Sequence, residues 1–194
     1  MKKSIAIIGE GETEWFYFES LRVACRYPYK LTPGFPQYAD IEHILKLAKA
    51  KLAEHYDYVV CLIDMDRLYE KPAEMKKYLS FKSRKENRDI MFVETSPCTE
   101  FWFLLHFLPD NTVRRYQNYD QLIPELRKYM PGYEKTKRYF IKTKLYDFLR
   151  ANGNLDRAKV NADRLSSMSK ASPEDRIAYS EIHKVLDLLD NLNR

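Results

Sequence analysis

The chain has 194 residues, which suits one elaborated domain or two small ones. Hydrophobic residues make up 45% of the sequence, enough for a buried core, so the composition excludes a disordered protein. A net charge of +5 is too small to identify a partner. The three cysteines, Cys25, Cys61 and Cys98, are odd in number and lack metal-ligand spacing, which argues against a zinc ribbon or a disulfide scaffold.

The apolar segments are short. The run at residues 4–8 ends at Gly9 and Glu10, whereas a signal peptide needs a longer apolar region and a cleavage site with small residues. The run at residues 101–105 is far too short to span a bilayer. We therefore expect a soluble, cytoplasmic protein with no membrane partner.

Strands and helices are predicted to alternate in the first 110 residues. Buried strands are expected at residues 4–8, 58–63 and 90–93, where apolar and β-branched residues gather. Helices are expected at residues 14–26 with Thr13 as N-cap, from Asp40 to about 52, at 72–87, and at 98–108 with Ser96-Pro97 as N-cap and first helical position. Residues 28–36 are expected to be irregular, with room for a short edge strand. This alternation predicts right-handed crossovers and an α/β fold with a mostly parallel sheet.

After residue 110 the strand signal stops, and helices are predicted at residues 119–130, 138–151, 155–168 and 173–192. We therefore divide the chain into an α/β core at 1–110 and a helical subdomain at 111–194. Residues 111–170 contain 14 Lys or Arg against 6 Asp or Glu. The same segment is rich in aromatic residues: Tyr116, Tyr119, Tyr129, Tyr133, Tyr139, Phe140, Tyr146 and Phe148. The charge can pair with phosphates and the rings can stack on bases, or the rings can simply pack the helices.

Acidic residues follow each of the three predicted strands. Glu10 follows the first, Asp64 and Asp66 end the second, and Glu100 opens the helix after the third. Sites in open parallel sheets form at the carboxyl ends of the strands. Asp64 and Asp66 are two apart in a segment expected to be extended, so both side chains should point to one face. Glu14, four residues beyond Glu10, should face the same crevice through a turn at Gly11.

Clustered carboxylates suit Mg²⁺ or Mn²⁺ rather than zinc, and such ions support phosphoryl transfer. We expect Glu10, Asp64 and Asp66 to lie close enough to share one ion. The competing interpretation is that each acid only stabilises a helix N-terminus. An Asp-x-Asp at a strand end favours the metal, because adjacent like charges are costly without a cation. Glu100 precedes a helix that is apolar all round, so its partner can be a metal, an arginine or a helix cap.

Four segments of the sequence resemble known families. Ile8-Gly9-Glu10-Gly11-Glu12-Thr13-Glu14 with Leu62-Ile63-Asp64-Met65-Asp66 resembles the Toprim pattern of a strand-end Glu followed by Asp-x-Asp. Ser96-Pro97-Cys98-Thr99-Glu100-Phe101-Trp102-Phe103-Leu104-Leu105-His106-Phe107 and Gly132-Tyr133-Glu134-Lys135 resemble the RloB-like family of bacterial Toprim proteins. Ser96 stands where that pattern has Asn, an exchange of one good N-cap residue for another.

The resemblance implies a Toprim core similar to that of OLD-type nucleases and a role in defence against phage. It assigns Glu10 to the general Toprim glutamate, Asp64 and Asp66 to the aspartate pair, and Glu14 to the second glutamate of the OLD-type motif. Glu100 falls where such nucleases supply a further acidic ligand.

The leading hypothesis is therefore a Mg²⁺- or Mn²⁺-dependent nuclease. Glu10, Asp64 and Asp66 hold the first ion, and Glu14 with Glu100 complete a second site. Lys135, Lys137 and Arg138 are the candidate nucleic-acid contacts, with Lys135 or Lys137 stabilising phosphate charge; the alternative for these residues is a solvated surface. Two other hypotheses stay open: a module that binds nucleic acid or a protein partner from a defence locus, with a weak or inactive site, and an enzyme acting on a small phosphorylated nucleotide. The choice between DNA and RNA is also open.

Overall fold

The computed structural model describes residues 3–27, 29–32 and 40–193. Most of the irregular stretch predicted at residues 28–36 lies outside the described residues, but the short edge strand expected within it is present at Lys30–Thr32. No helix in the described ranges combines the length and the apolar character needed to cross a membrane.

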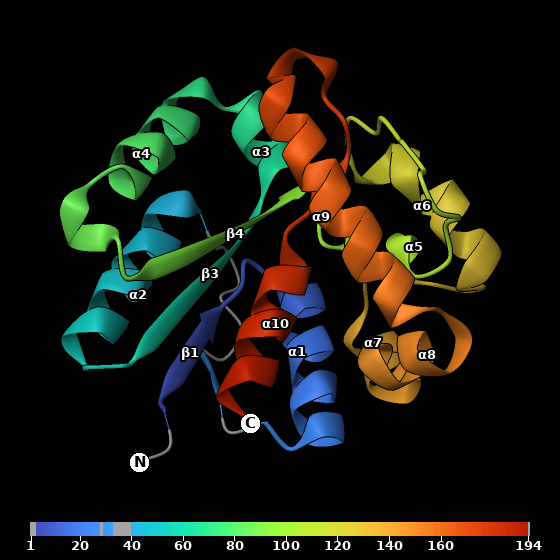
Figure 1. Ribbon diagram of the computed structural model, residues 1–194, viewed down its shortest axis with the longest axis horizontal. Helices are drawn as coiled ribbons and strands as arrows, with labels where there is room; N and C mark the ends of the chain where they lie inside the picture. Colours follow the sequence, from blue (N-terminus) through green and yellow to red (C-terminus); the bar gives the residue numbers. More distant parts are fainter. Residues whose placement is uncertain (1–2, 28, 33–39, 194) are drawn as a thin grey trace.

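Five strands form one sheet (Figure 1). Their bounds are β1 Ile5–Ile8, β2 Lys30–Thr32, β3 Tyr58–Asp64, β4 Ile90–Ser96 and β5 Tyr179–Ser180. The order across the sheet is β2-β1-β3-β4-β5, with the first four strands parallel and β5 antiparallel to β4. The mixed α/β fold with a mostly parallel sheet is thus confirmed, and the carboxyl ends of β1, β3 and β4 are adjacent.

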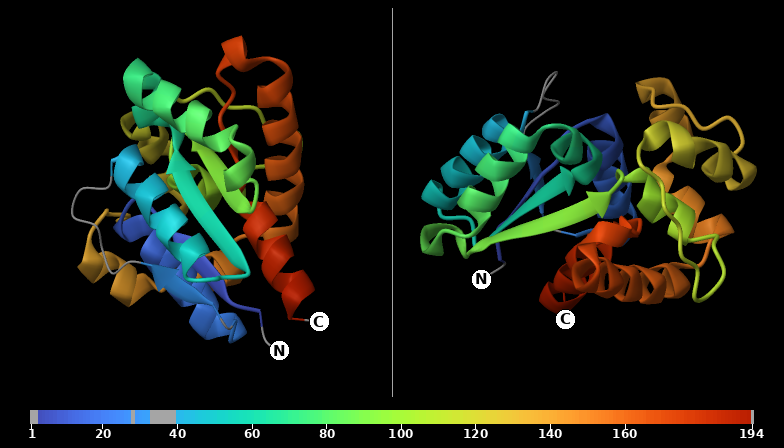
Figure 2. Two further views of the ribbon diagram at one scale, coloured as in Figure 1. Left: turned by 90° about the vertical axis from the view of Figure 1, so that its left-hand side faces the viewer. Right: turned by 90° about the horizontal axis from the view of Figure 1, so that it is seen from above.

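Ten α-helices and two short 3-10 helices occur in the described part of the chain. The α-helices are α1 Glu12–Cys25, α2 Ile41–Ala53, α3 Met65–Glu70, α4 Pro72–Lys82, α5 Glu100–Leu105, α6 Tyr119–Tyr129, α7 Lys137–Thr143, α8 Leu145–Asn152, α9 Leu155–Ala171 and α10 Ile182–Leu192. The 3-10 helices are Lys85–Asn87 and Pro173–Asp175. Helices α2 and α4 lie side by side over one face of the sheet, and α1 and α10 lie on the other (Figures 1 and 2).

The core is built from the apolar strands and from α5. Every residue of β1 is buried, and every residue of α5 is buried although the helix begins with Glu100. Trp102 of α5 donates its indole N–H to the hydroxyl of Tyr17 in α1 at 2.8 Å, which gives the polar atoms of both buried rings a partner. Because α5 is enclosed on all sides, its first residue is fixed at the carboxyl end of the sheet.

Several predicted helix boundaries are wrong. Helix α1 begins at Glu12 with Gly11 as N-cap, so Thr13 is inside the helix rather than its cap. Strand β4 continues through Ser96, the Ser96-Pro97 peptide bond is cis, and α5 begins only at Glu100; Ser96 and Pro97 therefore do not start the helix. The helix predicted at 138–151 is two helices, because Lys144 adopts a left-handed conformation (φ 50°) between α7 and α8.

The C-terminal segment is not entirely helical. The region predicted as one helix at 173–192 contains strand β5 before α10, and β5 pairs Ser180 with Thr95 and Tyr179 with Ser96. Helix α10 packs against β4. The chain after residue 110 therefore adds a strand and a covering helix to the sheet, in addition to helices α6–α9.

Candidate metal and nucleic-acid site

Glu10 and Asp64 lie at the ends of neighbouring parallel strands. Ile8 pairs with Cys61, so Glu10 extends beyond the end of β1 alongside the last residues of β3. The carboxylate Oε1 of Glu10 accepts a hydrogen bond from the backbone N–H of Asp64 at 3.1 Å. These two residues therefore lie next to each other, as their positions at adjacent strand ends predict.

Glu14 is held close to the end of β1 by the turn before α1. Its Oε2 accepts a hydrogen bond from the backbone N–H of Gly11 at 2.9 Å, so part of this buried carboxylate acts as a helix cap. A Cβ atom at Gly9 would lie 2.8 Å from the Cβ of Glu14, so glycine is needed there for the close approach. The helix-capping interpretation of Glu14 is correct for one of its oxygens.

Asp64 and Asp66 do not share a face by strand alternation, and that prediction is wrong. Strand β3 ends at Asp64 and helix α3 begins at Met65, so Asp66 lies in a helical turn. Its Oδ1 accepts a hydrogen bond from the backbone N–H of Arg67 at 2.6 Å. The backbone N–H of Asp66 in turn donates to the carbonyl oxygen of Pro97 at 3.1 Å, which ties the start of α3 to the segment after β4.

Two threonines hold the carboxylate of Asp64. Its Oδ1 accepts hydrogen bonds from the hydroxyl of Thr95 at 3.0 Å, and from the backbone N–H and hydroxyl of Thr99 at 3.0 and 3.2 Å. All three bonds fall on one oxygen. They fix the orientation of the carboxylate between β3 and β4.

Glu100 is completely buried and collects three donors on one oxygen. Its Oε1 accepts from the hydroxyl of Thr13 at 3.2 Å and from the hydroxyl of Tyr133 at 2.8 Å, and it lies 3.1 Å from the Nζ of Lys135. Its other oxygen, Oε2, is buried and has no hydrogen-bond partner among the described residues. An unpartnered buried carboxylate oxygen is costly, so Glu100 retains the capacity to accept a cation or a donor.

Lys135 connects the basic segment to these acids. It lies in the loop between α6 and α7, with its Nζ on Glu100 and 4.7 Å from the centre of the Tyr119 ring. Lys137 and Arg138 begin α7, have exposed side chains, and make no hydrogen bond or ion pair to the described residues. Lys135 thus faces the acids, whereas Lys137 and Arg138 face solvent a few residues further on.

Burial and mutual repulsion disturb the ionisation of the acids. Burial, followed by the charge of Glu14, raises the pKa of Glu10 to about 8. Burial and the charges of Glu14 and Glu10 raise the pKa of Asp64 well above its ordinary value, and burial raises the pKa of Asp66. Burial alone would lower the pKa of Lys135, but the charges of Glu100, Asp64 and Glu14 outweigh it and raise that pKa. Glu10, Asp64 and Asp66 therefore hold their protons more tightly than ordinary carboxyl groups, mainly because they are buried.

The donor atoms are the right kind for a hard cation, but they are not arranged as a finished ligand set. We call Glu10, Glu14, Asp64, Asp66 and Glu100 the strand-end cluster. Among residues 3–27, 29–32 and 40–193, no three His, Cys, Asp or Glu side chains form a ready-made metal-ligand group. That Glu10, Asp64 and Asp66 share one ion stays a prediction. Carboxylate oxygens, with the unpartnered Oε2 of Glu100 among them, fit Mg²⁺ or Mn²⁺ chemically.

The aromatic residues of the basic segment mostly pack the helices. Tyr133 and Phe140 are almost completely buried, and Tyr146 is buried as well. Tyr129 is 38% exposed, but its ring stacks on Phe107. Most of these rings therefore offer no free face to a nucleic-acid base, and charge is the main property that this segment can present.

Four residues that hold the cluster were not predicted from the sequence: Thr13, Thr95, Thr99 and Tyr133. Thr13 was expected to cap a helix, and it donates to Glu100 instead. Thr99 holds Asp64 and Tyr133 holds Glu100, both through hydroxyl hydrogen bonds. Only weak signals for these roles are present in the sequence: Thr99 is next to Glu100, and Tyr133 is two residues before Lys135. A single sequence does not show which hydroxyl groups lie close to which carboxylates in the folded chain.

One family model matches this chain over residues 5–189, and its description is "RloB-like protein". Searches of curated proteins and of solved structures each found no match. The match covers nearly the whole chain, from β1 to α10, and includes every residue of the strand-end cluster. The chain therefore belongs to the RloB-like family.

Proposed function

We propose that the protein is a divalent-metal-dependent nuclease of Toprim type. The observation that carries the proposal is the group of acids with raised pKa values at the carboxyl ends of β1, β3 and β4. Five carboxylates gather there, and the pKa values of Glu10, Asp64 and Asp66 are all raised. Such an arrangement opposes folding unless a cation offsets it, and hard oxygen donors select Mg²⁺ or Mn²⁺.

Glu10, Asp64 and Asp66 are the residues that we propose for the first ion, and Glu14 with Glu100 for a second. The bound metal would activate a water molecule and stabilise the leaving oxygen of a phosphodiester. Thr95 and Thr99 keep Asp64 oriented, and Thr13 and Tyr133 do the same for Glu100. These four residues position ligands and are not themselves expected to contact the substrate.

The substrate that we propose is a nucleic acid. Lys135, whose Nζ lies 3.1 Å from Oε1 of Glu100, would contact the phosphate at the point of cleavage once it leaves Glu100. Lys137 and Arg138 would contact neighbouring phosphates from the start of α7. Membership in the RloB-like family supports a role in bacterial defence against phage, in the cytoplasm, with a protein partner from the same locus.

Two observations favour a different function, that of a binding module with an inactive site. Lys135 already lies on Glu100, and no ready-made group of three ligands exists among the described residues. In that case the lysine would be a permanent counter-ion, and the surface around α7 would bind nucleic acid without cleaving it.

The test is a cleavage assay of the purified protein with Mg²⁺ or Mn²⁺ on single- and double-stranded DNA, RNA and small nucleotides. We expect metal-dependent cleavage of a polymer, reduced about 10²–10³-fold by Asp64→Asn because a charge that stabilises the transition state is lost. Asp156→Asn, at an exposed position in α9, is the matched control and should cleave normally. Binding without cleavage under every condition would support the binding module, and turnover of small nucleotides alone would support the third hypothesis.

A further inference from the structure

A basic groove is lined by residues of α2 and α4 and by Arg84. These two helices cover the face of the sheet opposite α1 and α10 (Figures 1 and 2). The groove has a volume of about 680 Å³. Five of its ten lining residues are basic, and one, Glu42, is acidic. The basic residues are Lys46, Lys49, Lys76, Lys77 and Arg84. None of them belongs to the site proposed above.

The floor of the groove is apolar. Leu45 and Phe81 are 6% and 8% exposed, and Ala73 lies in the exposed first turn of α4. Lysines from both helices line the groove above this floor, Lys46 from α2 and Lys76 from α4. Aliphatic stems of lysines extend an apolar surface, while their ammonium groups stay in water. The groove therefore combines an apolar strip with a positively charged rim.

The rim retains unpaired charge. Lys77 pairs with Glu42 at 2.8 Å and Lys49 with Glu86 at 3.3 Å. The side chains of Lys46 and Lys76 make no hydrogen bond or ion pair to any of the described residues. These two lysines line the groove from opposite helices and have no acidic partner among the described residues, so an occupant with negative charge on its edges would be electrostatically complementary.

The apolar floor helps to decide between two kinds of anionic ligand, a nucleic acid and an acidic peptide. A nucleic acid binds through phosphates and, where it is single-stranded, by stacking bases on exposed aromatic rings. Phe81 is the one aromatic ring among the described residues that line the groove, and it is nearly buried with Lys49 Nζ 5.4 Å from its centre. One ring with so little exposed area cannot stack a series of bases, whereas apolar side chains of a helix can also contact Ala73 and the stems of the lysines. A peptide with both aliphatic and acidic side chains would use both features of the groove. Its aliphatic side chains would contact the apolar floor, and its acidic ones would pair with the lysines of the rim.

We infer that this groove binds an acidic amphipathic helix of a partner protein. Helix-in-groove recognition inserts apolar residues at i, i+3, i+4 and i+7 into an apolar strip. Here the acidic residues flanking that face would pair with Lys46 on one rim and Lys76 on the other. The inference does not depend on metal binding or on nuclease activity, because no groove residue belongs to the strand-end cluster.

The probe is a synthetic helix of roughly 18 residues with Leu on one face and Glu on the other, with a scrambled peptide of the same composition as its control. Binding is measured by fluorescence anisotropy without divalent metal. We expect Lys46→Glu with Lys76→Glu to weaken binding about tenfold, which corresponds to about 1.4 kcal/mol. Ala73→Trp should also weaken it, because the large ring fills the floor without changing charge.

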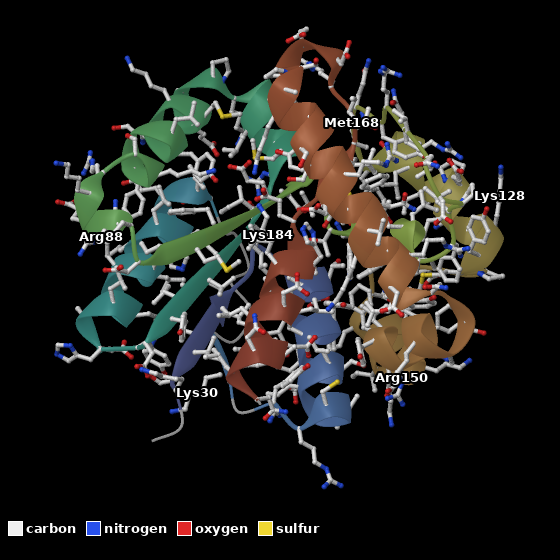
Figure 3. The ribbon with its side chains drawn as sticks, in the orientation of Figure 1. Lys30, Arg88, Lys128, Arg150, Met168 and Lys184 are labelled. Atoms are coloured by element: carbon white, nitrogen blue, oxygen red, sulfur yellow. The ribbon has the colours of Figure 1, made fainter. Side chains whose placement is uncertain are left out.

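Lys128→Glu with Arg150→Glu is the matched control, since both side chains project from α6 and α8 on the far side of the molecule from α2 and α4 (Figure 3). It changes net charge by the same amount and should leave peptide binding unchanged. Equal loss in this control, equal binding of the scrambled peptide, or no binding of the amphipathic peptide would each overturn the inference. Loss of oligonucleotide binding in Lys46→Glu with Lys76→Glu, while peptide binding persists, would assign the groove to nucleic acid instead.

Discussion

The strand-end cluster differs from a second pair of buried acids, Glu94 and Glu181, in how its charge is compensated. Glu181 Oε1 contacts the Nζ atoms of Lys170 and Lys184 at 2.6 and 2.5 Å, and its Oε2 accepts the backbone N–H of Glu94 at 3.1 Å. Burial alone would raise the pKa of Glu181, but the two lysines outweigh it and lower the pKa to about 2. Lys184, one of these two lysines, is labelled on α10 in Figure 3.

Glu94 is compensated in the same way. Its Oε1 accepts hydrogen bonds from the hydroxyl of Tyr78 at 2.5 Å and from Lys82 at 2.6 Å, and its Oε2 accepts from the hydroxyl of Tyr179 at 3.2 Å. Every oxygen of this pair has a donor from the protein. The acids of the strand-end cluster instead repel one another, and one oxygen of Glu100 has no partner among the described residues. The carboxylates of Glu94 and Glu181 thus have all their donors from the protein, whereas the strand-end cluster has room for a further donor or a cation.

The largest expected effect is on the stabilisation of the fold by metal, which should depend on the strand-end cluster and not on Glu94 and Glu181. Mg²⁺ at about 100 times its dissociation constant should stabilise the fold by about 2.7 kcal/mol, because it binds only the folded state. The double variant Asp64→Asn with Asp66→Asn should lose this shift in Tm, whereas Glu181→Gln should keep it. Thermal unfolding with and without Mg²⁺ measures both. A full metal response in the double variant would remove these aspartates from the metal site.

A smaller effect is expected when the compensated pair is broken. Glu181→Ala removes the acceptor for Lys170, Lys184 and the Glu94 N–H, and should cost about 2 kcal/mol of unfolding free energy, since both lysines can still reach water. Urea unfolding at pH 7 measures this cost. The same substitution at the exposed Glu54, which pairs with Lys51 three residues away, is the control and should cost far less.

The parts of the fold that local sequence determines were predicted well. Strand β1 is apolar throughout and β3 is apolar up to Asp64, so their burial and parallel crossovers follow from the pattern. Strand β5 has two residues, and its pairing depends on Thr95 and Ser96 far away in the chain. The break at Lys144 was also missed, because a left-handed residue other than glycine leaves no signal in the sequence.

The part of the site that follows from strand order was predicted correctly. The adjacency of Glu10 and Asp64 follows from parallel strands that end at the same edge. Asp66 was placed wrongly because the helix begins one residue after Asp64, and a strand pattern does not reveal so early a start. The contact of Lys135 with Glu100 depends on how the loop between α6 and α7 packs, which is a tertiary property.

The two regions should also respond to pH in opposite directions. Glu10 has a pKa of about 8 in the folded protein against an ordinary value of 4.5, so its contribution to stability is present below pH 4.5 and is lost as pH rises towards 8. Glu181, with a folded pKa of about 2, contributes above pH 4.5 and loses that contribution as pH falls towards 2.

Glu10→Gln should therefore flatten the metal-free stability curve between pH 5 and 8, by roughly 1–2 kcal/mol after allowance for solvent near this partly exposed side chain. Glu181→Gln should flatten the curve only below pH 4.5. Chemical unfolding across pH 3–8 in the presence of a chelator measures both. A Glu10→Gln curve parallel to that of the parent would show that Glu10 titrates normally.

The smallest expected effect on stability concerns the exposed end of the basic segment. Lys137→Ala with Arg138→Ala should change unfolding free energy by less than about 0.5 kcal/mol, because neither side chain forms a hydrogen bond or ion pair with the described residues. It should nevertheless weaken nucleic-acid binding and lower the slope of log affinity against log salt by about 1–2, one for each phosphate that is no longer neutralised. Metal affinity should not change, since the strand-end cluster stays intact.

The matched control is Lys30→Ala with Arg88→Ala, at the amino ends of β2 and β4, away from the strand-end cluster (Figure 3). An equal change of slope in this control would mean that binding follows total charge, and an unchanged slope in both would place the nucleic-acid path elsewhere on the molecule.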